Sequence, residues 1–327
     1  MNYASLIKDL ARGAQCAVNL SELDAEQLFG AILDGGVPEF ELGAILVALR
    51  VKGESESELI GFLRASVARM NSIERPRNRP RPIVLPTYNG SRRGANLTPL
   101  VAMILRRFGV PVLLHGSLES YGRVTSAHVL RQLGMLPTAS LVQTRQQFAE
   151  QEFAFAPTAI LSPGLAQLLS LRARLGLRNV AHTLVKLLDP FGGDGLVVST
   201  ATHPPYLEKM RGVLGAFGAT ALLFRGSEGE PYANPKRRPT IELLRHGESK
   251  VLFDAEHDTL VVLPGLPDEA DALTTANWIR RVIDGDLPVP MPILNQVAAC
   301  LYGCGYADDL AQAKALVSVE LNAHSHA

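Results

Sequence analysis

The hydrophobic period of this chain changes near residue 82, and that change limits the possible folds more than any other feature. Before it, apolar side chains recur at three- and four-residue intervals, which is typical of amphipathic helices. The residues Ser55 to Glu58 form a capping box, a pattern that starts a helix. We expect four helices in this part: residues 2–12, a segment from Ser21 to Gly35-Gly36, one that begins at Pro38, and one that begins at Ser55.

After a charged, proline-rich linker at 75–81, short apolar runs alternate with helical segments. We expect strands at 83–85, 110–114, 196–198, 220–224, 251–253 and 259–262. We expect helices at 96–108, 124–134, 205–217, 268–283, 291–303 and 308–321, with two more in 164–188. Strands that alternate with helices form a largely parallel sheet flanked by helices on both faces. The predicted fold class is therefore α/β with a separate all-helical N-terminal domain.

The charge of the chain is unevenly distributed although its net charge is zero. Residues 71–250 carry a net charge of +12, whereas residues 1–70 and 251–327 carry −4 and −8. Of the 23 cations in the basic segment, 19 are Arg, whose planar and permanently charged group suits phosphate. This bias favours a polyanionic partner. The alternative is a solvated surface that pairs with the acidic ends.

Composition excludes several classes of protein. No apolar run approaches the roughly 20 residues of a membrane-spanning helix, so we expect no membrane partner. The first 13 residues lack the basic segment and following apolar run of a secretory signal. The chain has three cysteines, and an odd number argues against a disulfide framework; they are Cys16, Cys300 and Cys304. We therefore expect a cytoplasmic protein.

Several local strings, in order along the chain, resemble the anthranilate phosphoribosyltransferase family, which is glycosyltransferase family 3 with the nucleoside phosphorylase class II fold. They are His115-Gly116, Phe155-Ala156-Pro157, the run from Leu171 to Arg178, and Leu294-Asn295 through Ala298-Ala299. With the change of period, the resemblance implies a helical domain of residues 1–75, joined in space by the helices at about 165–190. The rest of residues 76–327 would form the α/β domain. The resemblance also implies a homodimer through the N-terminal helices.

The loops that carry phosphoribosyl transfer in this family differ here. The family's Gly-Thr-Gly-Gly-Asp pyrophosphate loop corresponds to Pro86 through Gly94, where most of the glycines and the acid are missing. A Cβ in such a loop would block the approach of phosphate to backbone N–H groups. The family's Lys-His-Gly-Asn-Arg corresponds to Leu114 through Leu118, without either cation, and its Asp-Glu magnesium pair falls near Pro231-Tyr232. These changes favour a protein that is not an enzyme and needs no cofactor.

Cations stand near the altered motifs, and they carry the main prediction. In the family, the helix that corresponds to residues 172–178 lines a cleft between the domains, and Arg174 replaces a family Glu. The pattern resembles the basic groove of a non-enzymatic, DNA-binding branch of the family. Because the sequence holds no base-reading motif, we expect nonspecific binding of DNA or RNA, with single strands favoured over duplex. The candidate nucleic-acid-binding residues are Arg92, Arg93, Arg172, Arg174, Arg178, Lys236, Arg237 and Arg238.

The alternative is a glycosyltransferase or phosphoribosyltransferase that uses phosphoribosyl pyrophosphate and Mg²⁺ with an unknown acceptor. Glu228 and Glu230 could restore a weak metal site, since Mg²⁺ often needs only one or two carboxylates plus phosphate oxygens. A metabolite sensor that uses the cleft without turnover is a third class.

Other chemically active residues have structural interpretations. No nucleophile or carboxylate stands at diagnostic spacing from a histidine, so we expect structural roles for His115, His182 and His203. We expect Cys300 and Cys304 to be small core residues, and Gly192 to Gly195 to be a turn. The tyrosines near the basic loops could stack on unpaired bases, although their number is near chance; they are Tyr88, Tyr121 and Tyr232.

Overall fold

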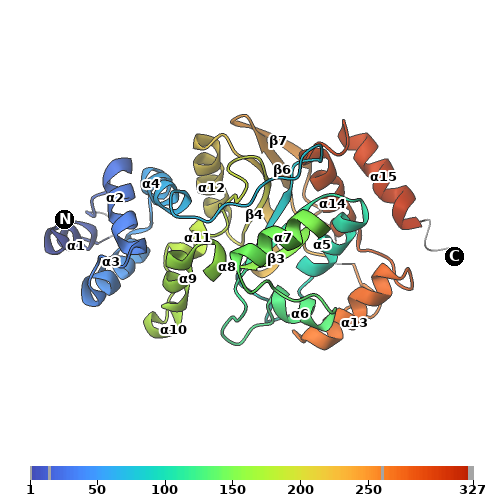
Figure 1. Cartoon of the computed structure of the whole chain (residues 1–327), viewed down its shortest axis with the longest axis horizontal. Coiled ribbons are helices and arrows are strands. Elements are labelled where there is room, and N and C mark those ends of the chain that lie inside the picture. Colours follow the sequence, from blue (N-terminus) through green and yellow to red (C-terminus); the bar gives the residue numbers. More distant parts are fainter. Residues whose placement is uncertain (1, 14–15, 259–260, 323–327) are drawn as a thin grey trace. The chain divides into compact units, whose positions relative to one another are not determined.

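The N-terminal helices begin at the caps that the sequence predicts. The computed structural model describes residues 2–13, 16–258 and 261–322. In it, the Ser21 side chain accepts a hydrogen bond from the Asp24 backbone N–H, and Ser55 and Glu58 form the expected capping box. The four helices are α1 (Tyr3–Leu10), α2 (Glu22–Leu33), α3 (Glu39–Lys52) and α4 (Glu56–Val67) (Figure 1).

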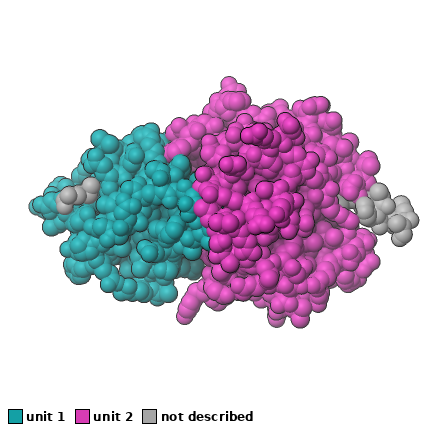
Figure 2. Space-filling model, viewed as in Figure 1, with its two compact units in different colours: residues 1–71, 158–188 teal, residues 72–157, 189–327 magenta. Residues whose placement is uncertain are grey.

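Four short helices from the middle of the chain belong to the same compact unit, where the sequence predicts two longer ones. They are α8 (Thr158–Leu161), α9 (Pro163–Ser170), α10 (Arg172–Leu175) and α11 (Ala181–Leu184). Pro163 cannot continue a helix, and Gly176 ends α10 in the left-handed conformation with a φ of 69°. Unit 1 therefore comprises Met1–Asn71 and Thr158–Leu188, and unit 2 comprises Ser72–Pro157 and Asp189–Ala327 (Figure 2).

Helices α2 and α4 form the closest pair in unit 1. The rings of Phe29 and Phe62 lie 4.9 Å apart, and both side chains are fully buried. A Cβ at Gly61 would lie 2.3 Å from the carbonyl oxygen of Glu22, so this close approach requires glycine. Buried Glu58 also accepts a hydrogen bond of 2.6 Å from Lys52 Nζ, which satisfies its charge.

A seven-stranded sheet forms the centre of unit 2, in the order β3-β2-β1-β4-β5-β6-β7. The first five strands are parallel, and β6 and β7 are antiparallel. The helical N-terminal bundle and the mostly parallel sheet together confirm the predicted fold class. The strands are β1 (Ile83–Thr87), β2 (Val112–Gly116), β3 (Phe153–Pro157), β4 (Leu196–Ala201), β5 (Thr220–Arg225), β6 (Ile241–Arg245) and β7 (Glu248–Phe253).

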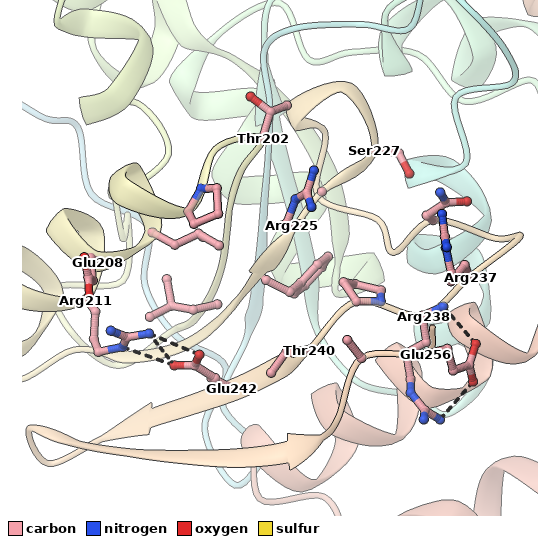
Figure 3. A pocket seen from close by; sticks show the side chains of 18 of the residues that line it. Thr202, Glu208, Arg211, Arg225, Ser227, Arg237, Arg238, Thr240, Glu242 and Glu256 are labelled. Carbon is pink, nitrogen blue, oxygen red and sulfur yellow. Dashed lines mark hydrogen bonds and ion pairs between the residues drawn. The ribbon is translucent and has the colours of Figure 1, made fainter. Parts of the chain in front are cut away.

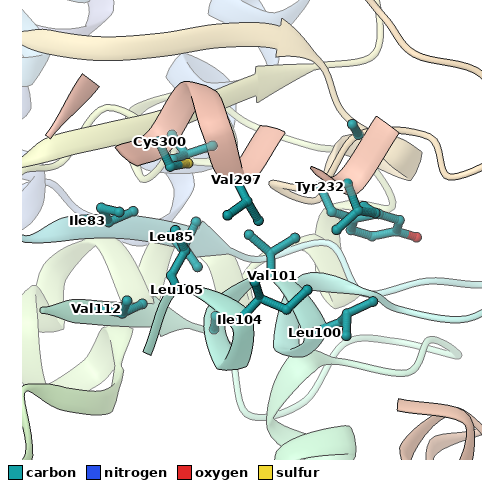
Figure 4. Packing of buried hydrophobic residues seen from close by; sticks show 14 of the residues in the cluster. Ile83, Leu85, Leu100, Val101, Ile104, Leu105, Val112, Tyr232, Val297 and Cys300 are labelled. Carbon is teal, nitrogen blue, oxygen red and sulfur yellow. The ribbon is translucent and has the colours of Figure 1, made fainter. Parts of the chain in front are cut away.

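Both faces of the parallel strands are buried, as expected when helices cover each side. Ile83 and Leu85 of β1 pack with Val101 of α5 and Val297 of α14 (Figure 4), whereas α12 packs against β4 and β5. The helices of unit 2 are α5 (Thr98–Arg107), α6 (Ser126–Gln132), α7 (Leu141–Gln151), α12 (Pro204–Ala216), α13 (Ala272–Ile283), α14 (Met291–Gly303) and α15 (Leu310–Asn322).

In unit 2 the sequence prediction lacks three elements and contains one strand that is wrong. Helix α7 and strands β3 and β6 are additional to it. The strand expected at 259–262 is wrong for Val261 and Val262, which have no regular structure, and its first two residues lie outside the described ones. No helix among the described residues is long and apolar enough to cross a membrane.

Candidate functional site

The strand order creates a switch point at the carboxyl end of β1, because β1 lies between β2 and β4. Ligands of open α/β sheets bind outside the carboxyl ends of the strands at such a point. Three segments meet there: the loop after β1 (88–94), the loop after β2 (117–125) and the loop after β5 (226–232). We refer to them below as the β1, β2 and β5 loops.

The β1 loop holds the carboxylate of Glu230, which is fully buried. Its Oε1 accepts hydrogen bonds from the backbone N–H groups of Asn89 (2.7 Å) and Gly90 (3.0 Å). Its Oε2 accepts a hydrogen bond from the Thr87 hydroxyl. Three weaker donors surround the same oxygen at 3.4 to 3.5 Å; they are Asn96 Nδ2, Ser126 Oγ and Thr98 Oγ1.

Glu228 holds the outer part of the same loop. Its Oε1 accepts hydrogen bonds from the backbone N–H groups of Arg92 (2.9 Å) and Arg93 (2.8 Å). Its Oε2 lies 3.1 Å from Nη1 of Arg123, which belongs to the β2 loop. Two carboxylates of the β5 loop therefore occupy successive backbone donors of the β1 loop.

This donor set does not fit magnesium, which the transferase alternative would place at Glu228 and Glu230. A hard cation needs oxygen lone pairs directed at it, whereas both carboxylates here face N–H and O–H donors. No group of three or more potential metal ligands occurs among the described residues.

The predicted cations of unit 2 lie in the β1 loop and shortly after the β5 loop. Arg92 and Arg93 are exposed, and only their backbone groups contact Glu228. Lys236 Nζ lies 3.4 Å from Asp268, and Arg238 Nη1 lies 3.3 Å from Glu256. The guanidinium carbon of Arg238 lies over the ring of Phe253. Arg237 and the unpredicted Arg225 are exposed and form no ion pair with any residue that the structure describes.

A cavity of about 860 Å³ opens between α12 and the ends of β5 and β6. Four Arg and four Glu line it, and two of these pairs are closed: Arg211 with Glu242 and Arg238 with Glu256 (Figure 3). The formal charges of its lining therefore cancel. Within this cavity, Arg225 and Arg237 are the cations that remain available for a ligand.

The three other predicted arginines belong to unit 1. Arg174 forms an exposed ion pair with Glu39. Arg172 and Arg178 lie close enough to His182 for their charges to lower its pKa, after the larger effect of burial, and the result is a pKa of about 3. This histidine is neutral in the folded protein, and its Nδ1 lies 3.2 Å from the Asn179 carbonyl oxygen, in agreement with a structural role.

The tyrosines differ sharply in exposure. Tyr88 is buried against His115, with which it shares a hydrogen bond, and Tyr232 is buried with its hydroxyl bonded to the Ala95 carbonyl. Burial also raises the pKa of Tyr232. Stacking on a base is therefore wrong for these two. The side chain of Tyr121, in the β2 loop, is 86% exposed.

The remaining candidates mostly have the expected structural roles. Cys300 and Cys304 are buried in the core of unit 2, where burial raises the pKa of both thiols. Gly192 to Gly195 lie in a turn, held by Asp189, whose carboxylate accepts hydrogen bonds from three backbone N–H groups. His203 is different, because it is exposed at the start of α12.

Sequence reasoning missed the polar residues that enclose Glu230. These residues are all buried and come from three segments. They are Thr87 of β1, Thr98 of α5 with Asn96 just before it, and Ser126 of α6. A usable signal was present, because Thr87 and Thr98 interrupt strongly apolar segments at the ends that face the switch point.

Comparisons with known proteins agree with this architecture. A family model described as "Glycosyl transferase family, helical bundle domain" matches residues 4–70. The anthranilate phosphoribosyltransferase (TrpD) of Thermus thermophilus has the same fold, with a TM-score of 0.77 over 99% of this chain and 95% of its own, at 24% identity. The Saccharomyces cerevisiae enzyme in complex with PRPP and Mg has a TM-score of 0.73 at 14% identity, covering 99% of this chain and 94% of its own.

Two relatives extend the likeness to the sequence. The uncharacterized protein YbiB of Escherichia coli (strain K12) is 39% identical over 97% of this chain and 99% of its own length. The anthranilate phosphoribosyltransferase of Synechococcus sp. (strain JA-3-3Ab) is 30% identical over 73% of this chain and 70% of its own length. The chain therefore belongs to the anthranilate phosphoribosyltransferase-like family, glycosyltransferase family 3.

Proposed function

We propose that this chain binds nucleic acid without sequence preference, on the β1 loop and the residues that flank the β5 loop of unit 2, with single strands of DNA or RNA favoured over duplex. The observation that carries the proposal is a group of four exposed arginines, Arg92, Arg93, Arg225 and Arg237, which pair with no acidic group among the described residues. Glu228 connects the two pairs, because it accepts hydrogen bonds from the backbone N–H groups of Arg92 and Arg93 and lines the same cavity as Arg225 and Arg237. Like charges near one another repel, and a polyanion offsets that repulsion.

Two features of the surface support single strands. The cations stand on separate loops, an arrangement that follows a flexible backbone better than a rigid groove. Exposed Tyr121 lies in the β2 loop, which is tied to the β1 loop by hydrogen bonds from Ser120 Oγ to the Asn89 carbonyl (2.8 Å) and from Arg123 to the Gly90 carbonyl (3.0 Å). A base stacked on Tyr121 would keep its phosphates near Arg92 and Arg93.

The proposal includes the chain's other expected properties. Lys236 and Arg238 would contribute charge while paired. In unit 1, Arg172, Arg174 and Arg178 would contribute positive charge of their own. A homodimer through the N-terminal helices would offer two such surfaces to one polymer, which raises apparent affinity. No cofactor is needed, and the cytoplasm would supply the nucleic acid.

The test is a salt titration of binding to a labelled single strand of about 20 nucleotides, followed by fluorescence anisotropy. If the four arginines neutralise four phosphates, affinity should fall about 50-fold between 50 and 200 mM salt. Replacement of all four by Gln should remove most of this salt dependence and weaken binding equally for unrelated sequences.

The matched control removes the same number of charges elsewhere, at Arg12, Arg64, Arg77 and Arg281. It should bind nearly as tightly as the unaltered chain. Equal binding by the Arg92, Arg93, Arg225 and Arg237 variant and by the control would contradict the proposal.

The relatives favour a second candidate, a phosphoribosyltransferase, because the solved structures of this fold include an anthranilate phosphoribosyltransferase in complex with PRPP and Mg. Of the two candidates, the comparisons support the transferase more directly, whereas the position of Glu230 favours the first. Calorimetry with phosphoribosyl pyrophosphate and Mg²⁺ separates them. Saturable micromolar binding would favour the transferase candidate, and its absence would exclude that candidate.

A further inference from the structure

We infer that the buried carboxylate of Glu230 occupies the anion site of the β1 loop, and that it thereby prevents phosphate groups from binding there. The inference goes beyond nucleic-acid binding and does not depend on it, because it concerns buried donors rather than the exposed arginines. Glu230 is fully buried, and its two oxygens are surrounded by six donors from the chain itself.

The composition of this donor set identifies an anion site. Consecutive backbone N–H groups that point at one oxygen, here those of Asn89 and Gly90, form the kind of concavity that binds phosphate. The remaining donors are the hydroxyls of Thr87, Thr98 and Ser126 and the amide of Asn96. No Lys or Arg of the described residues forms an ion pair with Glu230, so these donors alone compensate its charge.

The β5 loop that delivers Glu230 is held firmly in place. A Cβ at Gly226 would lie 2.2 Å from the carbonyl oxygen of Glu230, so the loop turns back closely on itself. Thr200 Oγ1 at the end of β4 donates a hydrogen bond of 3.1 Å to the Gly229 carbonyl. Glu228 fastens the same loop to Arg92, Arg93 and Arg123 from outside. The carboxylate is therefore a fixed occupant, which a small phosphate would have to displace.

Inorganic pyrophosphate is the probe, measured by calorimetry against the unaltered chain and three variants. Glu230→Ala removes the carboxylate and leaves its donors unpaired around an empty space. Glu230→Gln removes the charge and keeps the volume. Asp286→Ala, the control, removes a carboxylate that pairs with Arg281 in the same unit, outside the cavity that Arg225 and Arg237 line.

We expect Glu230→Ala to bind pyrophosphate at least 10-fold more tightly than the unaltered chain, Glu230→Gln and Asp286→Ala. Fluorescence of Trp278, the single Trp, which is buried in unit 2, verifies that the variants are folded. Equal binding by the unaltered chain and Glu230→Ala would overturn the inference, and so would a folded Glu230→Ala that binds no more tightly than Glu230→Gln.

A measurement on the unaltered chain keeps the inference testable if Glu230→Ala does not fold. A ligand that binds only the native state raises the unfolding midpoint. The inference predicts that pyrophosphate at about 10 mM changes the midpoint of the unaltered chain no more than that of Gly90→Ala. A rise of the midpoint that Gly90→Ala abolishes would refute the inference. Gly90 has a φ of 64° and its N–H binds Oε1 of Glu230, so an alanine there disturbs the donors of this site. Failure of nucleic-acid binding would leave both results unchanged.

Discussion

Glu230 and Asn89 lie 141 positions apart in the chain, and Oε1 of Glu230 accepts a hydrogen bond of 2.7 Å from the backbone N–H of Asn89. This contact joins the loops after β1 and β5, which are separated in the sheet by β4. A buried carboxylate without cation neighbours is stable only while its hydrogen bonds are complete. The shape of the β1 loop therefore depends on two acidic side chains: Glu230 holds Asn89 and Gly90, and Glu228 holds Arg92 and Arg93.

Glu230→Gln should lower the stability of unit 2 by about 3 kcal/mol, because hydrogen bonds to a buried charged group are lost and the new amide N–H₂ faces other donors. Urea unfolding followed by Trp278 fluorescence measures the change. The control is Glu242→Gln, which breaks a partly exposed ion pair with Arg211 and should cost about 1 kcal/mol or less. Equal losses in the two variants would show that Glu230 is no special anchor.

Tyr121→Ala should weaken binding to a single strand by about 5- to 100-fold, the usual range for one stacked base, and leave duplex binding nearly unchanged. The side chain is 86% exposed, so its removal should not alter stability. Anisotropy with single-stranded and duplex oligonucleotides of one sequence measures both effects. Tyr121→Phe keeps the ring and should bind as the unaltered chain does. A similar loss for the Ala and Phe variants would exclude stacking.

The fold follows from the sequence wherever one local signal decides it. Ser55 and Glu58 cap α4 as predicted, and the apolar run at 83–85 lies within β1. Strand β6 was missed because its residues Glu242 and Arg245 give it an irregular pattern. The turn after it did carry a signal in the sequence, which is Gly247. Both His246 and Gly247 have positive φ, as a two-residue hairpin turn requires, and glycine favours such a conformation.

The candidate site was predictable only in part. The loss of glycine from the β1 loop is visible in the sequence, and so is the excess of Arg. The place of Glu230 is not, because its donors come from three segments that only the sheet order brings together. From the sequence alone, Glu230 is a possible metal ligand. Its burial and its six hydrogen-bond donors, which only the structure shows, identify it as an internal anion.

The α3 surface predicts a homodimer that two substitutions should break. Phe40 is 85% exposed and Val51 is 65% exposed, and their spacing of about three turns puts them on one face of the helix. At micromolar concentration, sedimentation equilibrium should give about twice the chain mass of 35.3 kDa. Phe40→Asp with Val51→Asp should sediment as the single chain.

The control for this experiment changes two equally exposed valines of unit 2, Val142 and Val319, to Asp. This variant should remain a dimer, since nothing in the prediction involves that surface. A single-chain mass for the unaltered protein would rule out the dimer.

The pH dependence of unfolding should reveal His182. Burial, and then the charge of Arg178, lowers its pKa in the folded protein to about 3, whereas an unfolded histidine has a pKa of about 6.5. Below pH 6.5 the unfolded chain therefore binds a proton that the folded chain does not bind until about pH 3. Stability falls as the pH decreases through this window, by about 1.4 kcal/mol per pH unit at its steepest.

Between pH 7 and 5, urea unfolding followed by circular dichroism should show the unaltered chain losing about 2 kcal/mol more than His182→Gln. His203→Gln, at an exposed histidine, should lose as much as the unaltered chain. If His182→Gln instead loses as much stability between pH 7 and 5 as the unaltered chain, the folded protein also binds a proton at His182 and its pKa there is not lowered.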